Sequence, residues 1–473
     1  MMTDADFGLL DPSWAGTPAA AATSDTAVAQ ALLDVEAAWV GVLADAGHCP
    51  AAAADAVDAA ADASLYDLDD IARRSAGGGN PLIPLLADLR AELKATGAPD
   101  AAATVHRGAT SQDIVDTALM LVSARAGAAI RADLGTAAAG LARLAGTHRG
   151  TVCVARSLTQ HALPTTFGLR AANWLSGLTA AGQQLDAALA ALPLQWGGAV
   201  GTLASLTDSL EAGHDDAVPV PDLVTSLAAR LGLVDPGAPW HTNRMPVTVL
   251  GAALANTVAA AGTMAADVLT FSRPEIAEVS EPRAPGRGGS SAMPQKQNPV
   301  LSVLIRQAAL SAPQQAAQLF LAAGTAVDER PDGAWHSEWP ALRSLLRLAG
   351  GATAKLAELA TGLQVHPRAM AANAALTGDL LLSERLTSRL APLVDGGKPA
   401  VQQLIARSAA GGPELRPLLR DAVPPGALSD ADFDALFDPA GYLGQAGTFI
   451  DRILADHAVW STARPPRTTP SPS

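Results

Sequence analysis

Long segments with helical periodicity are the feature that most constrains the fold of this chain. Apolar residues recur there every three or four positions, as on the buried face of a helix. Alanine and leucine fill most of these positions, and aromatic residues make up only 4% of the sequence. Such composition favours closely packed helices over sheets. The sequence therefore predicts an all-α protein without strands, whose main helices span 24–47, 113–144, 166–192, 245–271, 299–323 and 341–363.

The length of 473 residues is too great for one ordinary domain. The pattern predicts an N-terminal helical domain over 1–104, a central bundle of long helices over 105–362 and a C-terminal helical domain over 363–462. The Pro- and Ser-rich tail, 463–473, is expected to be disordered. Within the bundle, residues 281–299 carry repeated glycine and proline and no apolar period. Long loops inside compact domains are usually functional.

The net charge of −14 excludes general electrostatic binding of nucleic acid. Two cysteines, Cys49 and Cys153, are too few for a disulfide framework, and acidic residues replace the basic start of a signal peptide. A cytosolic protein is expected. The segment 245–266 has no charged residue but is mostly small residues around Asn256, which favours a buried helix over a membrane span. No metal-ligand spacing or cofactor motif is present.

The loop 281–299 carries the residues best suited to chemistry. Gly289 is followed by two hydroxyls, Ser290 and Ser291, and by the ammonium group of Lys296. Glycine allows the backbone to approach a ligand closely, and free N–H groups can bind an anion. A nearby cation would stabilise a serine alkoxide, so Ser290 could act as a base.

The run from Gly289 to Pro299, GSSAMPQKQNP, resembles the GSSxMPxKxNP loop of the fumarase/aspartase superfamily. The resemblance implies an all-α homotetramer whose active sites are shared between subunits, and reversible β-elimination through a carbanion next to a carboxylate. Ser290 matches the catalytic base of the family. Lys296 would support it, while Ser291, Met293 and Asn298 would contact the substrate.

Two further segments resemble superfamily motifs, HRGATSQD at 106–113 and RSLTQHALPTT at 156–166. In the first, hydroxyl and amide donors stand just before a helix, which suits a carboxylate. In addition, an arginine in WHTNR could bind a carboxylate with two hydrogen bonds. The substrate-binding residues expected from these segments are His106, Thr110, Ser111, Gln112, Gln160 and Arg244.

Leu158 stands where the superfamily usually has its general-acid histidine. Leucine donates no proton, so the leaving group must be weakly basic, as a carboxylate is at neutral pH. This favours the 3-carboxy-cis,cis-muconate cycloisomerase branch, in which a carboxylate of a tricarboxylate adds to an alkene and closes a lactone in protocatechuate catabolism. Other segments, such as GAWHSEW at 333–339, also resemble that branch.

Three alternatives remain open at this point. A nitrosuccinate lyase would release nitrite, which also leaves without a proton; an adenylosuccinate lyase fits less well; a non-catalytic helical scaffold is a remote third possibility. The loop has Gln295 and Gln297 where the cycloisomerase branch often has basic residues, MPHKRNP. The sequence assigns no role to three histidines near the motifs, His161, His241 and His336.

Overall fold

The computed structural model describes residues 7–211 and 218–462 and confirms the all-α fold. The helices of the N-terminal part are α1 (Pro18–Ala22), α2 (Asp25–Asp45), α3 (Ala51–Ala60), η1 (Ala63–Leu65), α4 (Leu68–Gly78), α5 (Leu82–Ala95) and α6 (Pro99–Thr104). The central helices are α7 (Ser111–Thr147), α8 (Phe167–Ala190), α9 (Ala204–Glu211), α10 (Val220–Leu231), α11 (Met245–Phe271), α12 (Val300–Gly324) and α13 (Gly333–Gly362). The C-terminal helices are α14 (Pro367–Ala375), η2 (Gly378–Leu382), α15 (Ser383–Leu390), α16 (Gly397–Ala409), α17 (Leu415–Ala422), α18 (Asp430–Ala435), η3 (Pro439–Gly441) and α19 (Ala446–Thr462).

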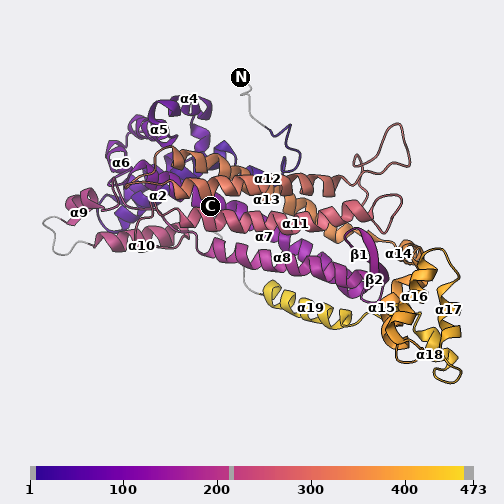
Figure 1. Cartoon of the computed structure of the whole chain (residues 1–473). Helices are drawn as coiled ribbons and strands as arrows, with labels where there is room; N and C mark the ends of the chain where they lie inside the picture. The colour runs from indigo at the N-terminus through magenta and orange to yellow at the C-terminus, as the bar shows by residue number, and fades with distance from the viewer. Residues whose placement is uncertain (1–6, 212–217, 463–473) are drawn as a thin grey trace.

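Five long helices, α7, α8, α11, α12 and α13, form the elongated bundle at the centre of the molecule (Figure 1). Their buried positions recur every three or four residues; on α11 they include Leu250, Leu254, Val258 and Ala261. Small residues let the axes approach closely. A Cβ added at Gly262 of α11 would lie 2.5 Å from that of Ala309 on α12.

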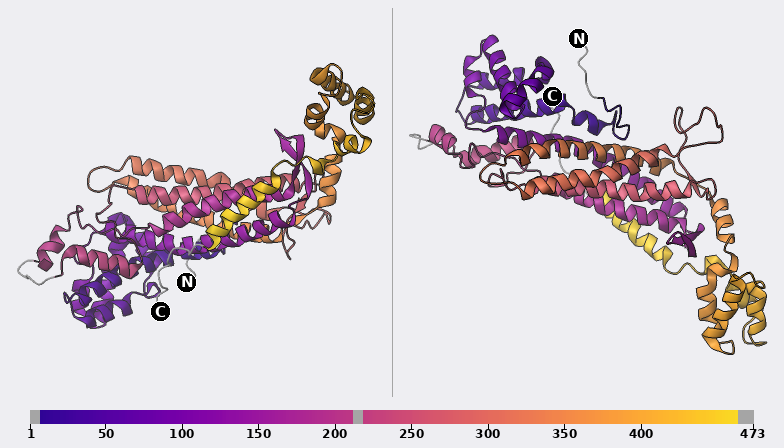
Figure 2. Two further views of the ribbon diagram at one scale, coloured as in Figure 1. Left: turned by 90° about the horizontal axis from the view of Figure 1, so that it is seen from below. Right: turned by 45° about the horizontal axis from the view of Figure 1, so that its top comes forward.

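The two ends of the bundle carry different sets of short helices. Helices α4–α6 lie at one end and α14–α18 at the other (Figures 1 and 2). The C-terminal set has its own apolar core between Leu382 and Phe437, whereas α19 returns along α8 and adds Ile450 and Trp460 to the main core. The domain boundaries given above stay predictions, and the tail 463–473 lies outside the described residues.

Two expectations about local structure are wrong. Residues 152–166 form an antiparallel hairpin, β1 (Val152–Ser157) and β2 (Gln160–Thr166), and a second short pair joins β3 (Val279–Ser280) to β4 (Gln364–Val365). These strands are too short to show a period of two in an Ala-rich sequence. Helix α13 begins at Gly333 rather than 341, with Pro340 inside it.

Two helices, α2 and α11, are long and apolar enough to cross a membrane by length and composition. In each case more than half of the most apolar window is buried inside the protein, 67% for α2 and 56% for α11. Core helices of a large bundle pass the same test, so these two helices are weak evidence for a membrane span.

Candidate active site

The loop 281–299, between β3 and α12, is fixed at its base and exposed at its tip. Buried Glu281 accepts hydrogen bonds from the backbone N–H groups of Leu301 (3.0 Å) and Ser302 (2.7 Å) and from the Ser302 hydroxyl (2.6 Å). It thereby caps the first turn of α12 with a negative charge, which the helix dipole favours. Arg287 adds an ion pair with Glu358 of α13.

The tip of the loop is closed by backbone contacts. Gly289 and Gln297 form a bridge, and the Asn298 N–H donates to the Gly288 carbonyl (2.8 Å). Gly288 has φ +74°, and a Cβ there would lie 2.6 Å from the Asn298 oxygen, so only glycine fits. The Ser290 hydroxyl accepts from the Met293 N–H (3.2 Å).

The five predicted loop residues thus lie together on this tip. Ser290 and Asn298 are half-buried, whereas Ser291, Met293 and Lys296 are exposed. The Lys296 ammonium makes no ion pair or hydrogen bond with any residue the structure describes. A free hydroxyl-rich turn beside an unpaired cation can receive an anionic ligand.

The β1–β2 hairpin presents the second motif at its tip. Leu158 is 93% exposed, and the two turn residues, Leu158 and Thr159, have φ of +48° and +71°. A two-residue hairpin loop requires such left-handed angles, yet leucine and threonine adopt them at a cost. Strain of this kind concentrates at functional sites. Gln160 follows, exposed, with its amide donating to the Thr159 hydroxyl (3.3 Å).

Buried Glu278 joins the hairpin to the chain that enters the loop. Its carboxylate receives two hydrogen bonds from Arg156 of β1 (2.7 and 3.2 Å) and one from Asn373 of α14 (2.9 Å), with Arg170 at 3.5 Å. Burial alone would raise the pKa of Glu278, but these donors and cations hold it below its ordinary value. On the same side, His161 lies 2.7 Å from the Thr377 hydroxyl and ties β2 to the C-terminal helices.

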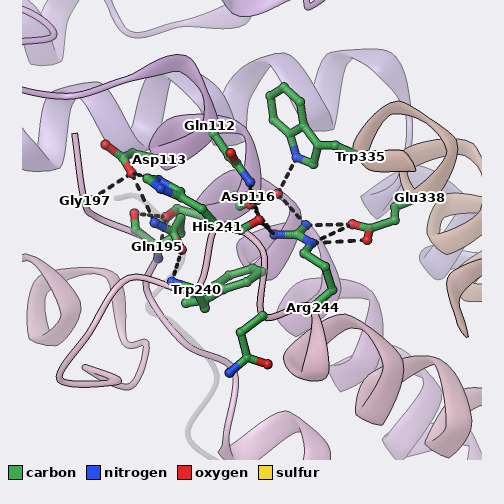
Figure 3. A network of polar contacts seen from close by, with 12 residues as sticks. Gln112, Asp113, Asp116, Gln195, Gly197, Trp240, His241, Arg244, Trp335 and Glu338 are labelled. Carbon is green, nitrogen blue, oxygen red and sulfur yellow. Dashed lines mark hydrogen bonds and ion pairs between the residues drawn. The ribbon is translucent and has the colours of Figure 1, made fainter. Parts of the chain in front are cut away.

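The third motif lies at the start of α7, the other end of the bundle. Asp113 is fully buried and accepts five hydrogen bonds. One oxygen binds the His241 ring (3.0 Å), the Gln195 amide and the Gly197 N–H, and the other binds the Gly198 and Thr110 N–H groups. Asp113 therefore holds both the His241 ring and the glycine turn after Gln195 against the helix start (Figure 3).

The arginine predicted to bind substrate pairs with two carboxylates inside the protein. Arg244 is 2% exposed and bonds Asp116 (2.7 and 2.9 Å) and Glu338 (2.6 Å), as Figure 3 shows. Burial would lower the pKa of Arg244, yet these carboxylates raise it above its ordinary value. Gln112 is also fully buried, donating to Asp116 and to the His241 carbonyl. Neither side chain faces an open surface in this chain, and the substrate contacts expected of them stay predictions.

A different arginine reaches the motif. Arg330, on the exposed segment before α13, donates from Nη2 to the Thr110 hydroxyl (2.5 Å) and to the Ala199 carbonyl (3.1 Å). Its Nε and Nη1 groups remain free among the described residues. Ser111 is half-buried beside Thr110, with the N-terminus of α7 behind it. Sequence reasoning missed Arg330 because it lies 220 residues from Thr110 and belongs to no helix pattern.

Two histidines, His106 and His336, lie at the same end of the bundle as the start of α7. His106 has its Nδ1 atom 2.7 Å from Glu36 of α2. His336 is exposed, packs against the rings of Trp335 and Trp339, and has its Nδ1 atom 3.2 Å from the Asp332 carbonyl. Among residues 7–211 and 218–462, no three His, Cys, Asp or Glu side chains cluster closely enough to hold a metal ion.

One chain does not bring the three motifs together. Helix α7 has 37 residues, which makes it about 55 Å long. Thr110 and Ser111 lie at its start, and the hairpin follows its end, at the same end of the bundle as the loop 281–299 (Figure 1). The residues predicted to bind a carboxylate and the predicted base are therefore at opposite ends of the bundle.

Comparison with known proteins identifies the family. A family model described as a lyase matches residues 17–313. The chain belongs to the fumarase/aspartase superfamily of lyases. It is 46% identical to the nitrosuccinate lyase of Streptomyces davaonensis over 462 residues, covering 96% of both chains. It is 39% identical to the 3-carboxy-cis,cis-muconate cycloisomerase of Bradyrhizobium diazoefficiens, covering 96% of this chain and 99% of that protein.

A solved structure agrees with the fold. The 3-carboxy-cis,cis-muconate lactonizing enzyme from Pseudomonas putida superposes with a TM-score of 0.87 at 36% identity, covering 96% of this chain and all of that one. The chain is therefore an enzyme of this superfamily, with relatives that carry out two different reactions.

Proposed function

We propose that the protein eliminates nitrite from nitrosuccinate and releases fumarate. The observation that carries this proposal is the 46% identity to a nitrosuccinate lyase along nearly the whole chain, against 39% for the cycloisomerase. The order of preference is therefore the reverse of the one that the sequence motifs favour. Gln295 and Gln297, which replace basic residues frequent in the cycloisomerase branch, agree with this choice.

The chemistry needs one base and no acid. In the proposed reaction Ser290, as its alkoxide, takes the proton from the carbon next to a carboxylate. The C–H electron pair becomes the second bond of the alkene, and nitrite leaves with the electron pair of the C–N bond. Lys296 and nearby N–H groups stabilise the charge that develops on the carboxylate. Leu158 is compatible with this step, since nitrite is weakly basic and leaves unprotonated.

The second candidate function is 3-carboxy-cis,cis-muconate cycloisomerase. The TM-score of 0.87 to a lactonizing enzyme favours it. There the substrate is a tricarboxylate, Ser290 in its neutral form gives a proton to carbon, and a substrate carboxylate adds to the alkene. The reverse reaction expels a carboxylate, so it also proceeds without an acid at position 158.

A shared active site is part of the proposal. The separation of the motifs along α7 suggests that the start of α7 in one copy meets the hairpin and the loop of others. Helices α11 and α12 expose a stripe of large apolar residues that a second copy would cover, Met245, Val249, Val303, Leu310, Phe320 and Leu321. We propose a cytosolic homotetramer that binds neither nucleic acid nor a membrane.

A direct assay tests the function. Purified protein is mixed with nitrosuccinate, and nitrite and fumarate are measured; a parallel assay follows loss of diene absorbance from 3-carboxy-cis,cis-muconate. Ser290→Ala serves as the control and is expected to abolish turnover while the oligomer stays intact. Turnover of the muconate alone would replace the first proposal by the second. Turnover of neither substrate would overturn both and favour a non-catalytic scaffold.

A further inference from the structure

A cavity of about 400 Å³ lies between α2, α7 and α13, and none of the residues predicted to contact substrate lines it. Each of the three helices contributes large aliphatic side chains to its walls, namely Val28 and Leu32, Val115 and Val122, and Leu342 and Leu346. Protein interiors are close-packed and leave few voids of this size. Cavities that bind small molecules have volumes of about 300–1,000 Å³ and walls that are mostly apolar.

Two arginines on consecutive turns of α13 line one side of this cavity. Arg343 donates from Nε to the Thr23 carbonyl (2.7 Å) and forms an ion pair through Nη1 with Asp25 (2.8 Å). Arg347 donates to the hydroxyl (3.1 Å) and to the carbonyl (3.2 Å) of Thr23, and its guanidinium lies 4.6 Å from the centre of the Trp14 ring. The two cations therefore share one backbone carbonyl. In the part of the chain that the structure describes, Nη2 of Arg343 has no partner.

The charges that line the cavity are unbalanced. Asp25 is the single carboxylate among the lining residues that the structure describes, against two guanidinium groups. The Asp25 side chain is 82% exposed, so its ion pair with Arg343 contributes little stability and reaches solvent. The N-terminus of α2, capped by Ser24, adds the positive end of a helix dipole. In a chain with a net charge of −14, a local excess of positive charge beside an apolar cavity favours an anionic ligand.

We propose that this cavity binds a small carboxylate with an apolar body. The carboxylate displaces Asp25 and accepts two parallel hydrogen bonds from Nη1 and Nη2 of Arg343, the geometry that a guanidinium group favours. The body of the ligand lies against the aliphatic walls and against Trp339, which lines the same cavity. Short dicarboxylates such as fumarate have no apolar body and do not fit this description, so the site goes beyond the proposed function and does not rest on it.

Calorimetry with two matched compounds tests the charge requirement. The probe is 3-phenylpropionate, and 3-phenylpropanol has the same apolar body without the charge. The acid is expected to bind the wild-type protein at least about tenfold more tightly than the alcohol, as for other hydrogen bonds to charged groups. Arg343→Gln keeps a polar side chain but removes the cation. It should weaken binding of the acid by about tenfold and leave binding of the alcohol unchanged.

A second variant tests the place of binding. Val122→Phe fills the cavity from α7 and should prevent binding of both compounds, while circular dichroism and the melting temperature report whether the variant is folded. The matched control, Arg452→Gln, removes an exposed arginine of α19 and should bind the acid as the wild type does.

Four results would overturn the inference. They are a wild-type protein that does not bind the acid, equal binding of acid and alcohol, equal binding of the acid by wild type and Arg343→Gln, and unchanged binding by folded Val122→Phe. None of these measurements involves turnover, so a failure here leaves the proposed function unaffected, and a failure of the nitrosuccinate assay leaves this site unaffected.

Discussion

Replacing Arg244 by methionine should destabilise the protein strongly without a specific effect on substrate binding. The Arg244 side chain is the cation that pairs with both Asp116 and Glu338, and all three side chains are at most 3% exposed. Removing the cation leaves two buried carboxylates unpaired, at a cost of about 3–5 kcal/mol. A chain of 473 residues has an unfolding entropy of about 1 kcal/mol/K at its midpoint, so the melting temperature should fall by about 3–5 °C.

Differential scanning fluorimetry measures this shift, with Arg452→Met on the exposed side of α19 as the control. Adding Asp116→Asn and Glu338→Gln to Arg244→Met should recover much of the loss, because the unpaired charges disappear. KM of the folded fraction should stay near the wild-type value. A melting temperature no lower than that of the control, or a large rise in KM without destabilisation, would refute the structural role of Arg244.

Three further predictions concern the anchors of the motifs. Glu281→Gln weakens the cap of α12 and should lower kcat and speed proteolysis within 281–299; equal rates in wild type and variant would contradict the anchoring role. The pKa of Glu278 lies below its ordinary value of 4.5, so its contribution to stability is fully present above that pH and is lost as pH falls through the folded-state pKa. Glu278→Gln should therefore flatten the acid side of a plot of unfolding free energy against pH; an unchanged slope would contradict this. Replacing Leu158 and Thr159 by Asn and Gly suits the left-handed turn and should stabilise the hairpin by about 1–2 kcal/mol, which a raised melting temperature would show and an unchanged one would refute.

Much of the helical fold could be predicted because its signal is local. The segment 245–271 has the same limits in sequence and structure, and the limits of α2, α7, α8 and α12 differ from the predicted ones by one to three residues. The hairpin at 152–166 could not be predicted in this way. Its strands are short, and it is fixed by contacts distant in sequence, such as that between Arg156 and Glu278.

The candidate site shows the same difference between local motifs and contacts that are distant in sequence. The five loop residues predicted between Ser290 and Asn298 belong to one contiguous motif, so the structure places them together on one loop tip, while their roles stay predictions. Arg244 also stood in a motif, but nothing in WHTNR shows that Asp116 and Glu338 would enclose it. Glu36 gave no signal either, since its partner His106 is 70 residues away. The role of a charged side chain depends on the groups that surround it in the fold, and a local sequence motif does not show those groups.

The positions of the unpaired cations support the proposed assembly. In a chain with a net charge of −14, an anionic substrate needs cations that are not already neutralised. Arg244 pairs with two carboxylates and Arg156 with Glu278, whereas the Lys296 ammonium and the Nε and Nη1 groups of Arg330 have no partner within residues 7–211 and 218–462. These two free cations lie at opposite ends of one bundle. A small dicarboxylate can contact both only where two copies place their ends together, so we expect activity to be lost whenever the oligomer dissociates.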